Sequence, residues 1–117
     1  MSDTPAAPPV VIEKRDHAVI ARVNVKLLDD KDLKLLSQLI DESAVGPGVS
    51  LVVIDLARVQ ILPSLGLGAL VQISNKCKAR DQALKIAAAQ PSIRKVFAIT
   101  RLDRILDLTD SVDTALQ

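Results

Sequence analysis

Apolar and polar residues alternate along the chain in patterns that predict strands and helices in turn. Residues 10–12 and 18–23 flank a charged cluster at 13–17, and this arrangement predicts a hairpin of two strands. Residues 51–56, an apolar run broken only by Asp55, predict a strand buried on both faces, as in a parallel sheet. Further strands are expected at residues 84–88 and 105–108.

Helices are predicted between these strands. Leucine and isoleucine recur at helical spacing over residues 30–43, where Asp29 and Asp30 can accept hydrogen bonds from the free amides of the first turn. The Gly-Pro-Gly segment at 46–48 favours the end of this helix. Residues 64–79 also repeat apolar residues at helical spacing, which predicts a second helix despite its two glycines.

Near the C-terminus, Pro91 suits the first position of a third helix. That helix is expected to place four apolar residues on one side, namely Ile93, Val96, Phe97 and Ile99. A last helical turn is expected at residues 111–116. Strands that alternate with helices in this way predict an α/β fold with a mostly parallel or mixed sheet. We expect one domain over residues 10–117 and a flexible, proline-rich tail at residues 1–9.

Composition narrows the class of protein. The chain has 117 residues, of which 49% are hydrophobic, 25% charged and 1% aromatic, so the core must be aliphatic. The net charge of +1 and the scarcity of aromatic rings argue against a nucleic-acid partner. Cys77 is the only cysteine, which fits a reducing compartment. Since no export signal or bilayer-spanning run is visible, we expect a cytoplasmic protein that does not insert into membranes.

Candidate catalytic and metal-binding residues are few. His17, the only histidine, lies in the predicted hairpin turn, where exposure to solvent is expected. Asp29, Asp30 and Asp32 resemble a metal cluster in composition, but their position indicates helix capping. Cys77 is expected to be a buried or half-buried apolar residue. The sequence therefore predicts no catalytic residue, no metal and no cofactor, and a protein that is not an enzyme.

One segment carries a more specific pattern. Residues 55–68 read DLARVQILPSLGLG, which resembles the signature of STAS domains, in which a strand ending in Asp-Leu precedes a serine-rich turn and Gly-Leu-Gly. Matching segments follow in the same order, at residues 78–80, 84–88, 91–96 and 102–105. The resemblance covers residues 10–116. It implies a central mixed sheet of four to five strands packed against about four helices.

Resemblance to the anti-sigma factor antagonists within this family implies a protein-binding switch. In those proteins the turn usually contains Asp-Ser-Ser or Asp-Ser-Thr, and the anti-sigma factor, itself a kinase, phosphorylates the second hydroxyl residue. In this register Pro63 takes the acidic position and Leu65 takes the phosphorylated position. An aliphatic side chain cannot accept phosphate. Ser64 is the remaining candidate for phosphorylation, and the alternative interpretation is that its hydroxyl caps the helix.

The predicted docking surface is the turn and helix at residues 62–79. A helix start presents unpaired amides and the positive end of the helix dipole, and glycine allows another backbone to approach closely. The candidate contact residues are Leu62, Pro63, Ser64, Leu65, Gly66 and Gly68. For Leu65, an exposed anchor and a buried core residue are both open at this point.

The resemblance implies an anti-sigma factor of the serine kinase type, or another signalling protein, as the partner. An alternative is a STAS regulatory subunit of a lipid-trafficking ABC transporter that binds the transporter's ATPase. Both functions would use the same turn and helix. The sequence leaves the oligomeric state open, a homodimer included.

Overall fold

The computed structural model describes residues 8–46 and 48–117. Its strands are β1 (Val10–Arg15), β2 (Ala18–Val23), β3 (Leu51–Asp55), β4 (Ala83–Ala87) and β5 (Asp107–Thr109). Its helices are α1 (Asp30–Ser43), α2 (Ser64–Ala79), α3 (Pro91–Ile99), α4 (Val112–Leu116) and a 3-10 turn, η1 (Leu102–Arg104). The predicted α/β class, with a mixed sheet of four to five strands and about four helices, is confirmed.

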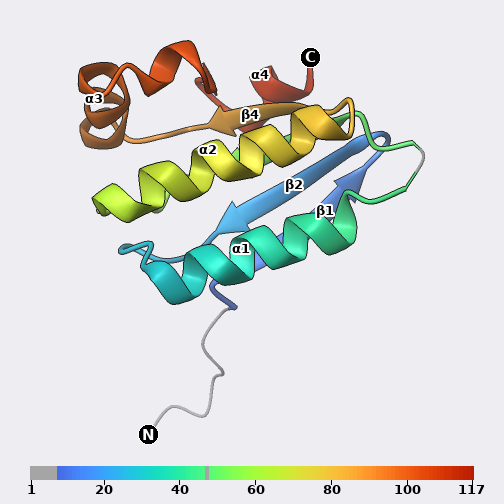
Figure 1. Cartoon of the computed structure of the whole chain (residues 1–117), viewed down its shortest axis with the longest axis horizontal. Coiled ribbons are helices and arrows are strands. Elements are labelled where there is room, and N and C mark those ends of the chain that lie inside the picture. Colours follow the sequence, from blue (N-terminus) through green and yellow to red (C-terminus); the bar gives the residue numbers. More distant parts are fainter. Residues whose placement is uncertain (1–7, 47) are drawn as a thin grey trace, which may run out of the picture.

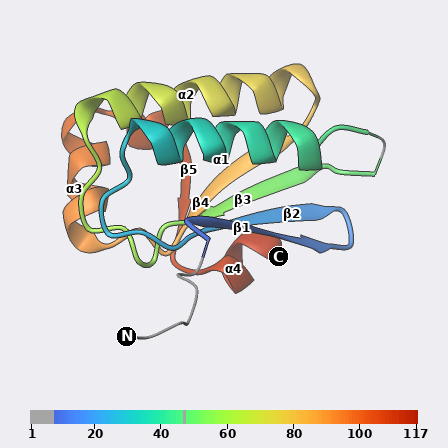
Figure 2. The same ribbon diagram turned by 90° about the horizontal axis from the view of Figure 1, so that it is seen from below.

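The five strands form one sheet in the order β1-β2-β3-β4-β5. The hairpin partners β1 and β2 are antiparallel, and every later neighbour is parallel. Helices α1 and α2 lie side by side on one face of the sheet, while α4 covers part of the other face (Figures 1 and 2). Because the strands from β2 onward are parallel, their carboxyl ends meet at one edge, where α1, α2 and α3 begin.

The core divides between the two faces of the sheet according to the alternation of strand side chains. Val52 and Ile54 of β3 belong to the large cluster under α1 and α2, which also contains Phe97. Val53, between them, belongs to a small cluster with Ala115 of α4. The continuous apolar run of β3 therefore reflects burial on both faces, as the sequence predicts.

Two predictions near the C-terminus need correction. Ile99 does not share the buried side of α3 with Ile93 and Phe97, because it is 72% exposed. Six positions along a helix are about one and two-thirds turns, which carries Ile99 round to the solvent side. The last strand begins at Asp107 rather than at residue 105, because η1 intervenes and the carbonyl of Leu102 accepts hydrogen bonds from the next two amides after the turn.

The predicted helix-ending segment at 46–48 follows α1, which ends at Ser43 with Ala44 as its C-cap; Pro47 lies outside the described residues. Most of the predicted tail, residues 1–7, also lies outside them. The carbonyl of Pro9 accepts a hydrogen bond from the Asn24 amide at 2.8 Å. No helix in the described ranges combines the length and the apolar character that crossing a bilayer requires.

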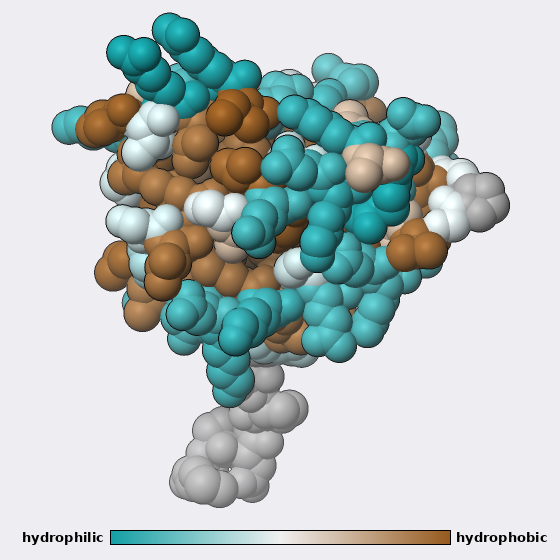
Figure 3. Space-filling model, viewed as in Figure 1, coloured by the Kyte–Doolittle hydropathy of each residue, from teal (hydrophilic) through white to brown (hydrophobic). Residues whose placement is uncertain are grey.

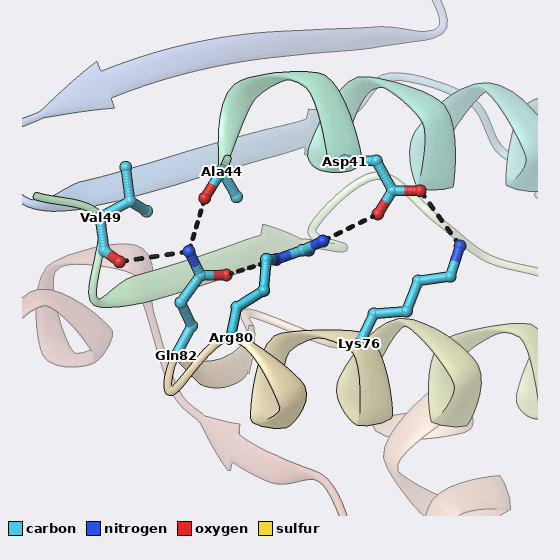
Figure 4. Close-up of polar contacts among 6 residues, drawn as sticks. All are labelled: Asp41, Ala44, Val49, Lys76, Arg80 and Gln82. Atoms are coloured by element: carbon cyan, nitrogen blue, oxygen red, sulfur yellow. Dashed lines mark hydrogen bonds and ion pairs between the residues drawn. The ribbon is translucent and has the colours of Figure 1, made fainter. Parts of the chain in front are cut away.

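A polar cluster joins α1 to α2 at the ends of the two helices that lie farthest from the carboxyl edge of the sheet (Figure 4). Asp41 of α1 accepts from Lys76 Nζ at 3.1 Å and from Arg80 Nη1 at 3.3 Å. Gln82, buried just before β4, donates from Nε2 to the carbonyl oxygens of Ala44 and Val49. These contacts hold α1, α2 and the start of β4 in one arrangement.

Candidate functional site

The site predicted from the sequence lies where α2 begins, at the carboxyl edge of the parallel strands (Figure 1). Pro63 is the N-cap of α2, with extended backbone angles, and no side chain caps this helix. Ser64 is already the first helical residue and is exposed. The interpretation of Ser64 as the capping residue is therefore wrong, because the proline occupies the cap position. Its hydroxyl lies at the surface beside the turn.

Residues of the turn divide sharply between surface and interior. Leu65 is 72% exposed, so it is not a buried core residue. Leu62 is only 9% exposed and belongs to the main core cluster, so it cannot offer its side chain to a partner. Pro63 and Gly68 are exposed. Of the predicted contact residues, Pro63, Ser64, Leu65 and Gly68 face solvent, whereas Leu62 and Gly66 do not.

Gly66 packs inside the molecule. A Cβ atom at this position would lie 2.6 Å from Leu62 Cδ1 and 3.2 Å from Leu33 Cδ1, so a larger residue would force these two side chains to shift. The expectation that Gly66 allows a partner to approach is therefore wrong. Gly68, by contrast, has no atom within 4 Å of a Cβ placed there, and it leaves the surface of α2 open.

Two exposed apolar residues that the sequence interpretation missed flank this turn. Leu27, before α1, and Ile61, before α2, form an isolated parallel bridge. Backbone hydrogen bonds fix it: the carbonyl of Lys26 accepts from the amides of Gln60 and Ile61 at 2.8 and 2.9 Å, and the carbonyl of Ile61 accepts from the Leu28 amide at 3.1 Å. The sequence shows a pair of apolar residues just before each helix, but only the structure shows that the first of each pair is exposed and the second buried.

Leu27, Ile61, Pro63 and Leu65 together form what we term the docking patch. Leu27 is 46% exposed and Ile61 is 58% exposed, although both are held in a rigid ladder. Apolar surface gathers at the left of the molecule, over the start of α2 (Figure 3). A contiguous exposed apolar patch on a rigid base is typical of a protein-binding surface.

Hollows adjoin Leu65 on both sides. One, of about 480 Å³, lies between the starts of α1 and α2 and is lined by Leu27, Asp29, Asp30, Lys31, Pro63 and Leu65. The other, of about 240 Å³, runs between the two helices and is lined by Leu65, Ala69 and Gln72 of α2 and by α1 residues that include Leu33 and Lys34. Leu65 thus projects between two hollows, and each hollow can receive a side chain of another protein.

The aspartate of the signature has a structural role. Asp55 Oδ1 accepts from the Ala57 amide at 2.9 Å, and Oδ2 accepts from Arg22 Nη1 at 3.1 Å. Arg22 also contacts Glu13 on β1, and this hydrogen bond is the main cause that lowers the pKa of the Glu13 carboxyl. Asp55 therefore shapes the chain after β3 and ties three strands together on the face opposite α1 and α2.

Of the remaining candidates, Asp29 and Asp30 line the hollow beside the docking patch, whereas His17 and Cys77 line none of the hollows that adjoin it. His17 is exposed in the hairpin turn, as predicted. Asp29 caps α1 by accepting from the Asp32 amide at 2.9 Å, and residues 8–46 and 48–117 bring no three potential metal ligands together. Cys77 is buried, as predicted, and burial raises the pKa of its thiol.

Comparisons with known proteins agree with this geometry. A model of the STAS domain family matches residues 9–115. The Mycobacterium tuberculosis protein Rv2638, whose name assigns it provisionally as an anti-anti-sigma factor, is 27% identical over an alignment of 92 residues that covers 76% of this chain and 61% of that protein. This chain thus spans less than two-thirds of the relative's length.

Solved structures share the fold over nearly the whole chain. An anti-sigma factor antagonist from Mycobacterium paratuberculosis is 27% identical, with a TM-score of 0.78 and coverage of 96% of each chain. The protein TM1081 of Thermotoga maritima is 19% identical, with a TM-score of 0.80 and coverage of 99% of this chain and 91% of that one. At that identity, the second likeness shows the fold alone.

Proposed function

The chain belongs to the STAS domain family, and from this premise we propose that it is a protein-binding regulator of the anti-sigma factor antagonist type. It binds an anti-sigma factor of the serine kinase type, or another signalling protein, in the cytoplasm and catalyses no reaction itself. The names of its relatives support the class of partner. The observation that carries the proposal is the exposure of Leu65, at the start of α2, inside the rigid docking patch.

Leu65 acts as the anchor of the interface. Fully burying a leucine side chain contributes about 1.5–3 kcal/mol. Because 72% of Leu65 is still exposed, its burial by a partner would contribute about 1–2 kcal/mol, or roughly a 5- to 30-fold gain in affinity. Neighbouring contacts that exclude water from such a buried side chain favour a contribution of this size.

Leu65 also changes how binding can be regulated. Since this side chain cannot be phosphorylated, the interface lacks the phosphorylatable group that the family usually places here, and the protein binds its partner constitutively unless Ser64 is modified. Ser64 is the exposed hydroxyl nearest to the patch. A phosphate there would bring nearly two negative charges next to Leu65 and would repel an apolar partner.

The test of docking is isothermal titration calorimetry with the kinase-type anti-sigma factors of the same genome. We expect Leu65→Ser to weaken binding roughly 5- to 30-fold, without changing the midpoint of thermal unfolding, since the side chain is exposed. Val45→Ser is the matched control, because Val45 is 63% exposed and follows the far end of α1. Equal binding by wild type and Leu65→Ser would refute the proposal.

Phosphorylation is tested separately by mass spectrometry after incubation with the bound kinase and ATP. Phosphate on the wild type that is absent from Ser64→Ala would establish a switch at Ser64. An unmodified protein that still binds would establish constitutive binding. The alternative partner, the ATPase of a lipid-trafficking ABC transporter, is distinguished by co-purification: recovery of that ATPase with no kinase would replace the anti-sigma role.

A further inference from the structure

Charge is distributed unevenly along the chain, although the net charge is only +1. From residue 56 to residue 102, eight residues are Lys or Arg and Asp81 is the single acidic residue. This segment includes the loop before α2, all of α2 and all of α3. The compensating carboxylates lie mainly in the first 55 residues and after residue 102. Within this segment Lys76 and Arg80 pair with Asp41 and Arg94 pairs with Asp110, whereas Arg58, in the loop before α2, forms no ion pair with any described residue.

A polar hollow of about 290 Å³ adjoins the patch beside the loops that carry Leu27 and Ile61. It is lined by Asn24, Val25, Lys26, Arg58, Gln60 and Gln90, with no carboxylate. Lys26 and Arg58 are exposed, and neither forms an ion pair with any residue that the structure describes. Lys26 is also the residue whose carbonyl holds the Leu27–Ile61 ladder, so the cationic hollow and the apolar patch are parts of one rigid unit.

The patch thus separates two hollows of different chemistry. On one side Leu27, Pro63 and Leu65 line the hollow toward α1. This hollow also contains Asp30, Lys31 and Asp29, whose carboxylate accepts from the amide that it caps. On the other side the charges that lie free are the Lys26 ammonium and the Arg58 guanidinium. A guanidinium pairs well with a carboxylate in a two-point contact, and an ammonium nearby strengthens the attraction.

From this juxtaposition we infer that the docking patch binds a protein segment in which an Asp or Glu lies beside a large aliphatic residue. The carboxylate enters the hollow of Lys26 and Arg58, and the aliphatic side chain packs on Leu27, Ile61 and Leu65. This inference rests on the proposed docking function and names the chemistry of the partner. The hollows favour side chains of a folded or extended protein segment over the surface of an anionic bilayer, which could not fill them.

The test is a titration of the isotopically labelled full chain, followed by NMR, with a soluble peptide in which Glu-Leu pairs are separated by Gly-Ser. We expect amide shifts at Leu27, Arg58, Ile61 and Leu65 and their near neighbours, and weaker binding as salt is raised. Peptides with Lys-Leu or Glu-Ser pairs are the matched controls, and both should bind on the order of tenfold more weakly, because one loses the charge and the other the apolar contact.

Charge-reversal variants complete the test. The double substitution Lys26→Glu with Arg58→Glu should weaken binding of the Glu-Leu peptide on the order of tenfold, whereas Lys78→Glu, exposed near the far end of α2, should leave it unchanged. Equal binding of the Lys-Leu peptide, shifts confined to another surface, or absence of shifts would overturn the inference. So would shifts at the patch with phosphatidylserine vesicles but not with the peptide. If Leu65→Ser still weakens binding of the anti-sigma factor in that case, the proposed docking function holds, and only the preference for an acidic segment is refuted.

Discussion

Gln82 provides a sharp test of how the scaffold under the docking patch is held together. Its side chain is buried, with 5% of the residue exposed, and both its nitrogen and its oxygen form hydrogen bonds within the protein. Nε2 donates to the Ala44 carbonyl at 2.6 Å and to the Val49 carbonyl at 3.2 Å, and Oε1 accepts from Arg80 Nε at 3.2 Å. Gln82→Leu keeps the approximate size and removes these bonds.

The expected cost follows from what remains unpaired. Ala44 is fully buried, so its carbonyl would lose a partner without gaining water, at a cost of about 1–3 kcal/mol. The contacts to Val49 and Arg80 are only partly buried, and together they should add on the order of 1 kcal/mol. The free energy of unfolding should therefore fall by about 2–4 kcal/mol. For a chain of this size that corresponds to a decrease in Tm of roughly 6–20 °C.

The assay is urea denaturation and thermal unfolding, each followed by circular dichroism. Gln38→Leu is the control, since Gln38 is exposed on α1 and, among the described residues, its side chain hydrogen-bonds with Glu42 alone; its effect should stay within about 0.5 kcal/mol. If Gln82→Leu were no more destabilising than Gln38→Leu, the buried amide would not link α1 to β4, and our account of the scaffold would fail.

Three further predictions concern packing, reactivity and capping. Gly66→Ala should destabilise the protein by about 1–2 kcal/mol in urea denaturation, because the new Cβ would meet Leu62. Gly68→Ala, with open space around it, should be neutral or stabilising by up to about 1 kcal/mol. The reverse order of the two stabilities would contradict the packing of α2. Cys77 should react with a thiol reagent at pH 8 only in denaturant, because burial blocks the reagent and the raised pKa of the thiol disfavours the thiolate. Labelling of the native protein as fast as the denatured protein would contradict this. Asp29→Ala should lower stability by about 1 kcal/mol through loss of the α1 cap, and an unchanged midpoint of unfolding would argue against the cap.

The sequence by itself determined the order and nearly the bounds of the main elements. The helices over residues 30–43 and 64–79 begin and end where the apolar spacing and the flanking residues predict, because periodicity, capping and helix-ending residues are local properties. The buried strand β3 could also be identified, since a continuous apolar run requires cover on both faces. The STAS resemblance followed from the residues of one segment, 55–68.

Only the tertiary structure decided which residues form the docking patch. Near the start of α2 the apolar spacing does not distinguish Leu62, which is buried, from Leu65, which is exposed. Leu62 packs beside Gly66 and Leu33 in the core, whereas Leu65 lies on the side of α2 that faces solvent. Leu27 and Ile61 become neighbours through backbone bonds between two loops far apart in the sequence. Exposure at a helix end depends on such distant contacts, and no local pattern contains them.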